Sequence, residues 1–458
     1  MARVFWFRRD LRLNDNVALN TAIEAAQSDG DSQVWPASLL NSAEYDSWSG
    51  MRQHSLTASL RELDASLGDS LSVLKAANEA SKASLFATEV SALGAKIVHA
   101  TRAFDPQGVA EQNAVGLALK AKGIHLQLDD SYYAVRPGTI LKGDGTAYRV
   151  YTPFFKAWFD QLRVQPQPLR AGATFSRFYP GQAPEPTKSS PFKVVAGEAF
   201  ALRTLERFEM RALDEYDTVR DRADLSGTSH LSHALAHGEI HPRTILARLR
   251  DQPGHNVFRK EIAWREFYAD VLWHNPSSLT DYYEPKFAQM RYDVGSLSDQ
   301  RLAAWKQGKT GFPMVDAGMR QLLATGWMHN RVRMIVASFL VKDLHLEWQQ
   351  GAEWFEQHLS DFDPASNSHG WQWTAGSGTD ASPYFRVFNP ITQGYKFDPD
   401  GNYVRKYVPE LRHIQGSAVH EPWLLLDGLA HGYPAPIVDH AAEREEALAR
   451  LAELKTLT

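Results

Sequence analysis

Four residues at helical spacing form the first group of side chains that could do chemistry. They are Glu261, Trp264, Arg265 and Tyr268, which are three or four positions apart. On a helix such residues share one face. An aromatic stripe at this spacing is typical of a core, but a carboxylate and a guanidinium are costly to bury without partners. Their presence on the same face favours a binding cavity.

A second group lies at the predicted start of an apolar helix, within the sequence Gly326-Trp327-Met328-His329-Asn330-Arg331-Val332-Arg333-Met334. Cations in a first helical turn oppose the helix macrodipole, so a ligand phosphate or a partner carboxylate is needed to stabilise them. Asp361 and Asp363 supply carboxylates downstream. No His or Glu beside these two Asp completes a ligand set, so no metal site is predicted.

Hydroxyl side chains form a third group, in the sequence Gly227-Thr228-Ser229-His230-Leu231-Ser232. They lie before or at the start of a predicted helix, where free backbone N–H groups attract phosphate. Hydroxyls at this place are also the usual helix N-caps. The spacing alone is consistent with both interpretations.

The N-terminal elements that must position such residues are those of a layered α/β domain. The first 130 residues alternate short β-branched or aromatic runs with amphipathic patterns, which is typical of a parallel sheet covered by helices. The predicted strands are residues 4–7, 33–39, 72–75, 96–100 and 124–128, and helices are predicted at 51–67, 79–93 and 108–122. Arg8-Arg9-Asp10 follows the first strand in place of a G-x-G-x-x-G turn, so no dinucleotide fingerprint is present.

The remainder of the chain is predicted to be helical after a broken connector. Six prolines fall within residues 163–192, which is typical of a surface connector. Helices are predicted at 200–216, 242–249, 257–273, 313–325, 331–344 and 353–359. The expected fold is an α/β N-terminal domain with a Rossmann-like parallel five-stranded sheet, plus an all-α C-terminal domain. The expected limits are 1–130 for the first domain, 131–199 for an interdomain linker and 200–458 for the helical domain.

Composition removes several kinds of chemistry. The 458 residues include no Cys, which excludes disulfide frameworks, thiolate zinc sites, iron–sulfur clusters and cysteine nucleophiles. The sequence has no signal-peptide pattern and no apolar run long enough to cross a membrane, so we expect a cytoplasmic protein with no membrane partner. Histidine and carboxylate chemistry, or a bound cofactor, are left. The 13 Trp are the unusual feature.

Together these segments resemble the photolyase and cryptochrome family, and most closely the class I cyclobutane pyrimidine dimer photolyases. The similarity begins at Phe5-Trp6-Phe7-Arg8-Arg9-Asp10-Leu11-Arg12 and covers almost the whole chain. Its most specific segments are residues 228–232, 264–268, 309–311 with 315–317, 327–334 and 370–388. The resemblance implies an N-terminal antenna domain and a C-terminal helical domain that holds FAD, which is active in its reduced form.

The resemblance assigns many residues to FAD. Arg333 would pair with Asp361 beside the isoalloxazine, and Asn367 would face the N5 atom of the flavin. His230 and Phe258 stand where some members carry Arg and Trp. The full set expected to contact FAD is Tyr216, Thr228, Ser229, His230, Leu231, Ser232, Phe258, Glu261, Trp264, Arg265, Asn330, Arg333, Asp361, Phe362, Asp363 and Asn367.

The activity that the resemblance implies is light-dependent repair of UV-damaged DNA by a deoxyribodipyrimidine photo-lyase. Excited reduced FAD would donate an electron to a flipped-out pyrimidine dimer, the ring would split, and the electron would return. The residues expected to contact the dimer are Glu261, Trp264, Asn330, Met334 and Trp373. Those expected to contact the DNA are Arg220, Arg265, Arg331 and Arg386. The resemblance also implies a monomer.

A route of aromatic rings for photoreduction of the flavin is also implied by the resemblance. Trp371 would be the inner relay and Trp348 the middle one. Residues 290–296, where family members carry a surface Trp, contain none. Tyr292, Trp305 or Trp354 could take its place.

The antenna chromophore has three possible states. Phe104-Asp105-Pro106-Gln107-Gly108 lacks the Asn-Glu pair of folate-binding members. It is more similar to the Glu-Pro-x-Gly stretch of deazaflavin-type members. The resemblance therefore favours a deazaflavin over a folate, and the third possibility is that no antenna is bound.

Other functions share part of these observations. A cryptochrome-type blue-light photoreceptor would have the same fold and FAD with little or no repair activity, but the chain ends soon after the family motifs and leaves little tail. A (6-4) photolyase is disfavoured because those members carry His where Asn330 and Met334 stand. An α/β nucleotide-binding domain joined to a helical interaction module would explain the periodicities but not the ordered motifs.

Charge is distributed unevenly along the chain, whose formal net charge is −5. Residues 1–130 carry 12 Lys and Arg against 16 Asp and Glu, whereas residues 286–342 carry nine Lys and Arg against three Asp. Net charge describes the average surface and not a binding face. The acidity lies largely in the predicted antenna domain, and the basic segment is expected to lie at the DNA-binding face.

Overall fold

A computed structural model describes residues 2–380 and 386–456 of the chain. The chain folds into two compact units. The first comprises Met1–Arg211 and Ser229–Pro276, and the second Ala212–Thr228 and Ser277–Thr458. The predicted domain limits at residues 130 and 199 follow the change in periodicity rather than this division into units, and they stay a prediction.

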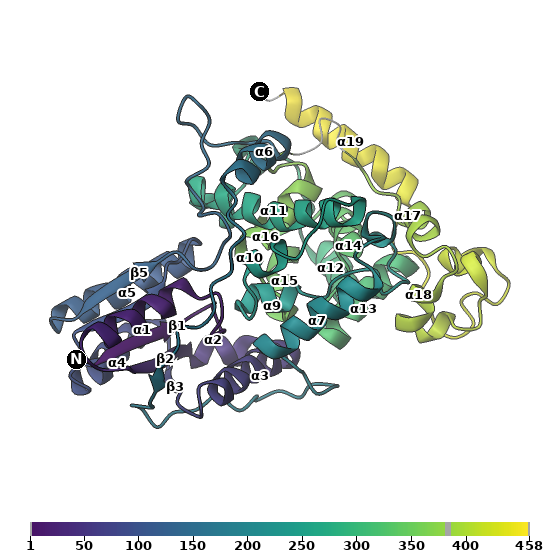
Figure 1. Ribbon diagram of the computed structural model, residues 1–458. Coiled ribbons are helices and arrows are strands. Elements are labelled where there is room, and N and C mark those ends of the chain that lie inside the picture. The colour runs from purple at the N-terminus through teal and green to yellow at the C-terminus, as the bar shows by residue number, and fades with distance from the viewer. Residues whose placement is uncertain (1, 381–385, 457–458) are drawn as a thin grey trace. The chain divides into compact units, whose positions relative to one another are not determined.

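The first unit contains a parallel sheet with the strand order β3-β2-β1-β4-β5 (Figure 1). Its strands are β1 (Arg3–Phe7), β2 (Gln33–Asn41), β3 (Ser72–Ala76), β4 (Ile97–Thr101) and β5 (His125–Asp129), and a short β6 (Thr174–Phe175) pairs with β2. All of these pairings are parallel. The predicted Rossmann-like five-stranded sheet is confirmed, and each predicted strand agrees with the observed one to within two residues. β6 was not predicted.

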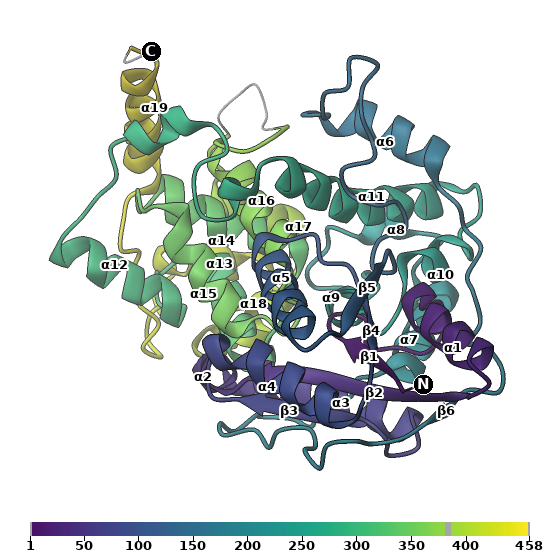
Figure 2. The same cartoon turned by 90° about the vertical axis from the view of Figure 1, so that its left-hand side faces the viewer.

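The two faces of the sheet have separate apolar cores because side chains alternate along a strand. Phe5 and Phe7 of β1 pack with residues of α1 (Val17–Ser28) and α3 (Gly50–Ser66), whereas Val4 and Trp6 pack with residues of α4 (Glu79–Ala92) and α5 (Pro106–Ala121). Figure 2 shows these helices beside the strands of the sheet. The helices of this part are α1 (Val17–Ser28), α2 (Ser42–Ser47), α3 (Gly50–Ser66), α4 (Glu79–Ala92) and α5 (Pro106–Ala121). The amphipathic helices predicted at 51–67, 79–93 and 108–122 correspond to α3, α4 and α5.

The proline-rich segment 163–192 lacks helix, as expected, but it is not a free connector. Gly181 O accepts a hydrogen bond of 2.9 Å from Val73 N on β3. A Cβ at Gly181 would lie 2.1 Å from Val73 O, so only glycine permits this approach. Phe175 and Ala183 pack against the core on the α1 side of the sheet. The segment therefore covers the outer edge of β3, a role that local sequence pattern does not reveal.

Five further helices belong to the first unit: α6 (Tyr151–Gln161), α7 (Glu198–Arg211), α9 (Ser232–His237), α10 (Pro242–Leu246) and α11 (Pro253–His274). The single helix predicted at 200–216 is wrong, because α7 ends at Arg211. Buried Ala212 and Leu213 continue the apolar period through a turn in which Tyr216 N donates to Leu213 O. The apolar periodicity therefore continues past Arg211 and does not indicate where the helix ends.

The buried carboxylate of Glu266 on α11 forms hydrogen bonds with the chain that follows β5. Glu266 is 2% exposed and accepts hydrogen bonds from Ala134 N, Val135 N and Trp158 Nε1, the last at 2.7 Å. Burial raises the pKa of the Glu266 carboxyl. These bonds fix one side of α11, so the residues on its other side are held in a defined orientation.

The second unit is helical. It contains α8 (Tyr216–Val219), α12 (Ser296–Gln307), α13 (Pro313–Thr325), α14 (Asn330–Lys342), α15 (Trp348–His358), α16 (Pro364–Ala375), α17 (Pro390–Phe397), α18 (Asn402–Tyr407) and α19 (His440–Thr456). Short 3-10 helices occur at Pro276–Leu279, Pro285–Gln289, Pro409–Leu411, Gly416–His420 and Pro422–Leu424. Its core is built on α13 and α14, with side chains from α15 and α16. The prediction of a helical C-terminal region is confirmed.

A buried aspartate locks the loop before α13. Asp316 is fully buried and accepts hydrogen bonds from Thr310 N, Thr310 Oγ1, Gly311 N and Tyr433 OH at 2.6 to 3.0 Å. Burial raises the pKa of this carboxyl. The segment 309–311 with 315–317 thus holds its own loop together. Among the helices of the described residues, none combines the length and apolarity needed to cross a membrane.

His99 on β4 predicts a specific acid sensitivity. It is fully buried, and neither ring nitrogen has a hydrogen-bond partner among the described residues. Burial lowers the pKa of His99 from 6.5 to about 4, with Arg3 adding to the effect. The unfolded chain therefore takes up a proton at this site below about pH 6.5, whereas the folded chain does so only below about pH 4. Stability falls as the pH is lowered through this window.

We expect His99→Leu to remove about 3 kcal/mol of the loss in unfolding free energy between pH 6.5 and pH 4, since each pKa unit corresponds to about 1.4 kcal/mol. Denaturant unfolding monitored across this pH range measures the effect. The control is His431→Leu at an exposed histidine. Equal pH slopes for His99→Leu and the parent protein would contradict the prediction.

Candidate functional site

Within the first unit, α11 presents the predicted group along one face. Glu261, Trp264, Arg265 and Tyr268 are all half-buried, whereas the intervening Ile262, Ala263, Glu266 and Phe267 are buried. The ring of Trp264 stacks on Tyr151 with a centroid distance of 3.8 Å and an interplanar angle of 7°. This stacking sets the orientation of one predicted dimer contact, and no sequence pattern pointed to Tyr151.

Arg265 is held by its own unit. Its Nη2 donates to Leu235 O at 3.2 Å, and its guanidinium lies 4.7 and 4.8 Å from the ring centroids of Tyr132 and Tyr133. A guanidinium between aromatic rings gains cation–π stabilisation. Arg265 therefore has a structural role in addition to any ligand that it contacts.

Of the two interpretations of the hydroxyl segment 228–232, the structure does not support the N-cap. α9 begins at Ser232 with Leu231 as its N-cap residue, and no side chain caps the first turn. Ser229 Oγ accepts a hydrogen bond from Leu231 N at 3.3 Å, and His230 adopts a left-handed φ of 54°. Ser229 thus shapes the turn rather than the helix end. Phe258, the predicted aromatic neighbour of the flavin, is buried against Phe208 in the same unit.

In the second unit, Arg333 and Asp361 form an ion pair. Arg333 Nη2 lies 2.7 Å from Asp361 Oδ2, and Arg333 Nε donates to Met328 O at 2.8 Å. Asp361 is 5% exposed, and its Oδ1 has no hydrogen-bond partner among the described residues. A buried carboxylate oxygen without a partner is costly. This oxygen therefore suits a ligand that offers an N–H or O–H group.

Further predicted residues lie just beyond, at the start of α16. Asp363 is the N-cap of this helix and accepts from Ser366 N at 2.9 Å, so its carboxylate is engaged in capping. Asn367 Nδ2 donates to Ala352 O at 3.1 Å, which fixes the amide plane. Phe362 is half-buried against the core. Hydrogen bonds to backbone atoms thus hold the side chains of Asp363 and Asn367 in defined orientations.

Trp371 is buried on α16, where Phe355 and Trp305 contact its ring at centroid distances of 5.1 and 6.1 Å. A Cβ at Gly351 would lie 2.1 Å from Trp371 Cη2, so glycine is required for this packing. The indole nitrogens of Trp371 and Trp348 have no partner among the described residues. Both rings thus lie in apolar surroundings.

A chain of rings leads from Trp348 to the residue predicted to replace the surface Trp. Trp348 is 1% exposed and meets Tyr282 edge-on, with a centroid distance of 6.3 Å. Tyr282 in turn stacks on Tyr292 at 6.2 Å. Both tyrosines are half-buried. Tyr282 OH donates to Glu347 Oε1 at 3.3 Å.

The surroundings of the two phenols favour their protonated forms. Burial raises the pKa of Tyr282, and it raises the pKa of Tyr292 to about 12. Of the other two residues that could replace the surface Trp, Trp305 is fully buried and donates to Val336 O at 3.0 Å. Trp305 therefore does not reach the surface. Trp354 is half-buried and packs on His358. Only Tyr292 is connected to Trp348 through an intervening ring in the described part of the chain.

Two of the arginines predicted to contact DNA flank one aspartate in the second unit. Arg331 Nη2 lies 2.9 Å from Asp221 Oδ2, and Arg220 Nε lies 3.8 Å from Asp221 Oδ1. The Arg331 guanidinium also lies 4.6 Å from the ring centroid of Phe397. Arg220 lies 5.6 Å from the ring centroid of Tyr216. The cluster of Arg220, Arg331 and Asp221 carries one net positive charge.

Arg386 is exposed and is held through its backbone by α14. Lys342 Nζ donates to Arg386 O at 2.5 Å, and Phe388 N donates to Ser338 Oγ at 3.2 Å. Trp373 Nε1 donates to Asp380 O at 3.2 Å. Residues 381–385, part of the predicted segment 370–388, lie outside the described residues. Asn330 is exposed at the start of α14, and Met334 is half-buried one turn later.

The basic segment 286–342 is less positive in the fold than in the sequence. Its cations pair with acids from other parts of the second unit: Arg291 with Glu446, Arg301 with Glu443, Arg320 with Glu410, Arg331 with Asp221 and Arg333 with Asp361. The net charge counted over residues 286–342 alone does not include these acidic partners. Five of the nine cations of this segment are therefore paired with acids outside it, so the expected basic face is less positive than the sequence count suggests.

Comparisons with known proteins agree with this organisation. Residues 3–172 match the model of the DNA photolyase family, and residues 258–453 match the FAD binding domain of DNA photolyase. The chain is 35% identical to the deoxyribodipyrimidine photo-lyases of Alkalihalophilus pseudofirmus and Escherichia coli, with 97% of this chain and of each relative covered.

A solved structure of a class III photolyase from Agrobacterium tumefaciens has a TM-score of 0.87 and 37% identity, and the match covers 99% of this chain and 98% of that one. The assignment to class I therefore stays a prediction. The prediction of a deoxyribodipyrimidine photo-lyase is confirmed by the full-length relatives of that name. The chain belongs to the DNA photolyase family.

Proposed function

We propose that this chain repairs cyclobutane pyrimidine dimers in DNA in a light-dependent reaction that uses reduced FAD. The observation that carries the proposal is the ion pair of half-buried Arg333 with buried Asp361, whose second carboxylate oxygen has no partner among the described residues, in the part of the chain that matches an FAD-binding domain. When bound, FAD supplies a light-excitable electron donor. The protein has to bind it, orient it and keep charges matched around it.

The residues of the Asp361 region fit a flavin. Asp361 Oδ1 can accept a hydrogen bond from an N–H or O–H group of the cofactor, and the ion pair with Arg333 orients the carboxylate. The amide of Asn367 is neutral, so it can hydrogen-bond to a flavin nitrogen without adding charge. We propose that these residues and the others assigned to FAD by the family resemblance form its binding set.

Aromatic and amide side chains are suited to a flipped-out pyrimidine dimer. Trp373 has its indole N–H engaged with Asp380 O, and no ring among the described residues contacts it. Its faces are therefore suitable for stacking on a base. Asn330 and Glu261 offer hydrogen-bonding groups for the pyrimidine edges. Trp264 presents an apolar ring supported from behind by Tyr151.

The tyrosine pair supports a modified route of photoreduction. We propose that an electron leaving Trp371 is replaced from Trp348, and that Trp348 is reduced in turn by Tyr282. Oxidation of a phenol releases a proton, and Glu347 Oε1, already hydrogen-bonded to Tyr282 OH, accepts it. The products are a neutral tyrosyl radical and a protonated carboxyl. Tyr292 stacks on Tyr282 and can share the radical at the outer end.

An antenna of the deazaflavin type is proposed on the strength of the stretch 104–108. Asp105 of this stretch caps α5 by accepting from Gly108 N at 2.8 Å, so the local turn is well defined. Bands of a second chromophore in the absorption spectrum of the purified protein identify it.

Blue-light repair of a thymine-dimer oligonucleotide tests the main proposal. We expect the purified protein to show flavin absorption and to restore the dimer to thymines in light but not in darkness. Asp361→Asn should lower the FAD content severalfold because the buried negative charge and its ion pair with Arg333 are lost, whereas exposed Asp299→Asn should not. Flavin bands without repair would favour a cryptochrome-type photoreceptor. Absence of flavin would contradict both functions.

The arginine cluster predicts a change in salt dependence. Arg331→Ala should weaken binding to thymine-dimer DNA and reduce the slope of log K against log salt concentration by about 1, since one phosphate contact is lost. Fluorescence anisotropy at several salt concentrations measures both quantities. The control is exposed Lys75→Ala on β3. An unchanged slope for Arg331→Ala would remove this residue from the DNA interface.

The tyrosine route predicts that Tyr282→Phe slows photoreduction of oxidised FAD about tenfold or more, because no phenol proton can pass to Glu347 and the charge returns. Absorbance under blue light with an external reductant measures the rate, and transient absorption detects the tyrosyl radical. The neighbouring Tyr283→Phe is the control. Repair by chemically reduced enzyme should be unchanged in both variants.

Two results would contradict this route. Photoreduction of Tyr282→Phe at the parental rate would remove the phenol from it. Equal photoreduction in Trp371→Phe and the parent would show that the whole relay is wrong.

A further inference from the structure

The buried side of α14 carries two polar side chains among apolar ones. Ser338 and Lys342 are four residues apart, so they lie on the same side of the helix. Ser338 is fully buried and Lys342 is 3% exposed. The residues between them, 339–341, belong to the apolar core of the second unit. A polar group among apolar side chains costs free energy unless a partner compensates for the lost water.

The ammonium group of Lys342 is the more costly of the two. A lysine at a protein surface usually buries its methylene stem and keeps its charged end in water, but this one does not reach solvent. Burial lowers the pKa of Lys342 to about 7, an effect that the negative charge of Asp343 opposes. Asp343 Oδ1 is itself hydrogen-bonded to His440 Nδ1 of α19. An apolar side chain would fill this place at less cost, so packing alone does not explain a lysine here.

Both side chains contact the backbone of one short segment, residues 386–388. Lys342 Nζ donates to Arg386 O at 2.5 Å, and Phe388 N donates to Ser338 Oγ at 3.2 Å. A single hydrogen bond would let the segment rotate about it, but two bonds that are two residues apart fix both its position and its direction. The two buried polar groups of α14 therefore hold this segment.

The chain that follows the segment is anchored as well. Asn389 Oδ1 accepts hydrogen bonds from Ile391 N at 2.9 Å and Thr392 N at 3.0 Å, so Asn389 caps α17. Segment 386–388 thus leads directly from its contacts with α14 into a capped helix. Arg386 is exposed, so its side chain extends into solvent from a backbone that is held on one side.

We propose that Lys342 and Ser338 are positioning residues for DNA binding, which hold the backbone of Arg386 so that its guanidinium meets a DNA phosphate. This role rests on the proposed function, in which Arg386 contacts DNA. A segment that becomes ordered only on binding lowers the affinity, because the lost backbone freedom costs free energy. An anchored Arg386 avoids this cost. Lys342 is too buried to contact a phosphate itself.

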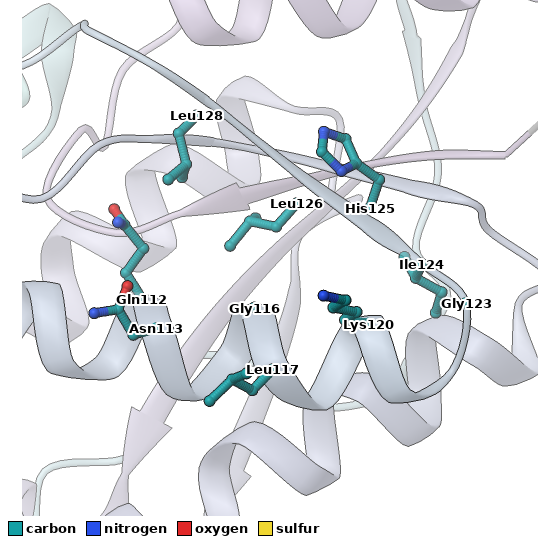
Figure 3. Close-up of a pocket in the computed structure, with 10 residues that line it drawn as sticks. All are labelled: Gln112, Asn113, Gly116, Leu117, Lys120, Gly123, Ile124, His125, Leu126 and Leu128. Carbon is teal, nitrogen blue, oxygen red and sulfur yellow. The ribbon is translucent and has the colours of Figure 1, made fainter.

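Lys120 provides a matched control. It is an exposed lysine on α5, where it lines an open groove of about 790 Å³ between α5 and β5 (Figure 3). His125 of the same lining is also exposed, and buried Gln112 accepts a hydrogen bond from Ala103 N at 2.9 Å. These polar groups have water or a backbone partner, so they require no ligand. Lys120→Met thus removes an exposed positive charge without removing a backbone anchor.

The salt dependence of DNA binding tests the proposal on the full-length protein loaded with FAD. We expect Lys342→Met to weaken binding to a thymine-dimer oligonucleotide about tenfold and to reduce the slope of log K against log salt concentration by about 1, as Arg386→Ala does. Ser338→Ala should change both quantities in the same direction but less, because one anchor remains. Lys120→Met should change neither. Flavin content and melting temperature report whether each variant is folded.

A double-mutant cycle separates positioning from a general structural effect. If Lys342 acts through Arg386, Lys342→Met should cause no further weakening in an Arg386→Ala background. Equal weakening in both backgrounds would overturn the proposal, and so would the parental slope in Arg386→Ala. Parental affinity and slope in both Lys342→Met and Ser338→Ala would overturn it as well.

Two further results are distinguishable from these. If Lys342→Met loses its flavin, Ser338→Ala in the same two backgrounds decides between the outcomes. Failure of the parent protein to bind thymine-dimer DNA would contradict the proposed function together with the positioning role, whereas the results above contradict the positioning role alone.

Discussion

The ion pair between Arg333 and Asp361 is the interaction on which the second unit's predicted site depends. It joins the first turn of α14 to the residues that lead into α16, and seven predicted residues of this unit lie on those two helices. Removal of Arg333 would leave the buried carboxylate of Asp361 without its counter-charge, which is destabilising. The pair also leaves one carboxylate oxygen unsatisfied. The Asp361 side chain thus both joins the two helices and offers a hydrogen-bond acceptor to a ligand.

Sequence pattern predicted those features that depend on local periodicity. The five long strands and nine of the 19 α-helices of the described residues, α7 with a wrong end, were predicted from alternation and from 3.6-residue repeats. The helix start at Asn330 agrees with its predicted position to one residue. Features that depend on distant partners were not predictable. Asp221, which neutralises Arg331, is 110 residues away, and Glu347 is 65 residues from Tyr282. No local pattern indicates that such residues meet, and the same limit explains why the basic segment was overestimated.

Similarity of a motif to a family does not by itself identify a functional site. The segment with Thr310 and Asp316 is among the most specific parts of the resemblance, yet its carboxylate is saturated by four hydrogen bonds within its own loop and from Tyr433. Asp361 differs because one of its oxygens has no partner among the described residues. Unsatisfied buried polar atoms therefore distinguish candidate ligand contacts from packing residues better than motif membership does.

The missing surface Trp shows how a change of residue alters the chemistry required around it. An indole can lose an electron and remain a cation in a polar surface position, but a phenol must lose its proton together with the electron. Burial raises the pKa of Tyr292 to about 12, so simple ionisation beforehand is not available. A proton acceptor is needed, and Glu347 is hydrogen-bonded to Tyr282 at the junction with Trp348. In the proposed route, the replacement of one ring thus gives a neighbouring carboxylate the role of proton acceptor.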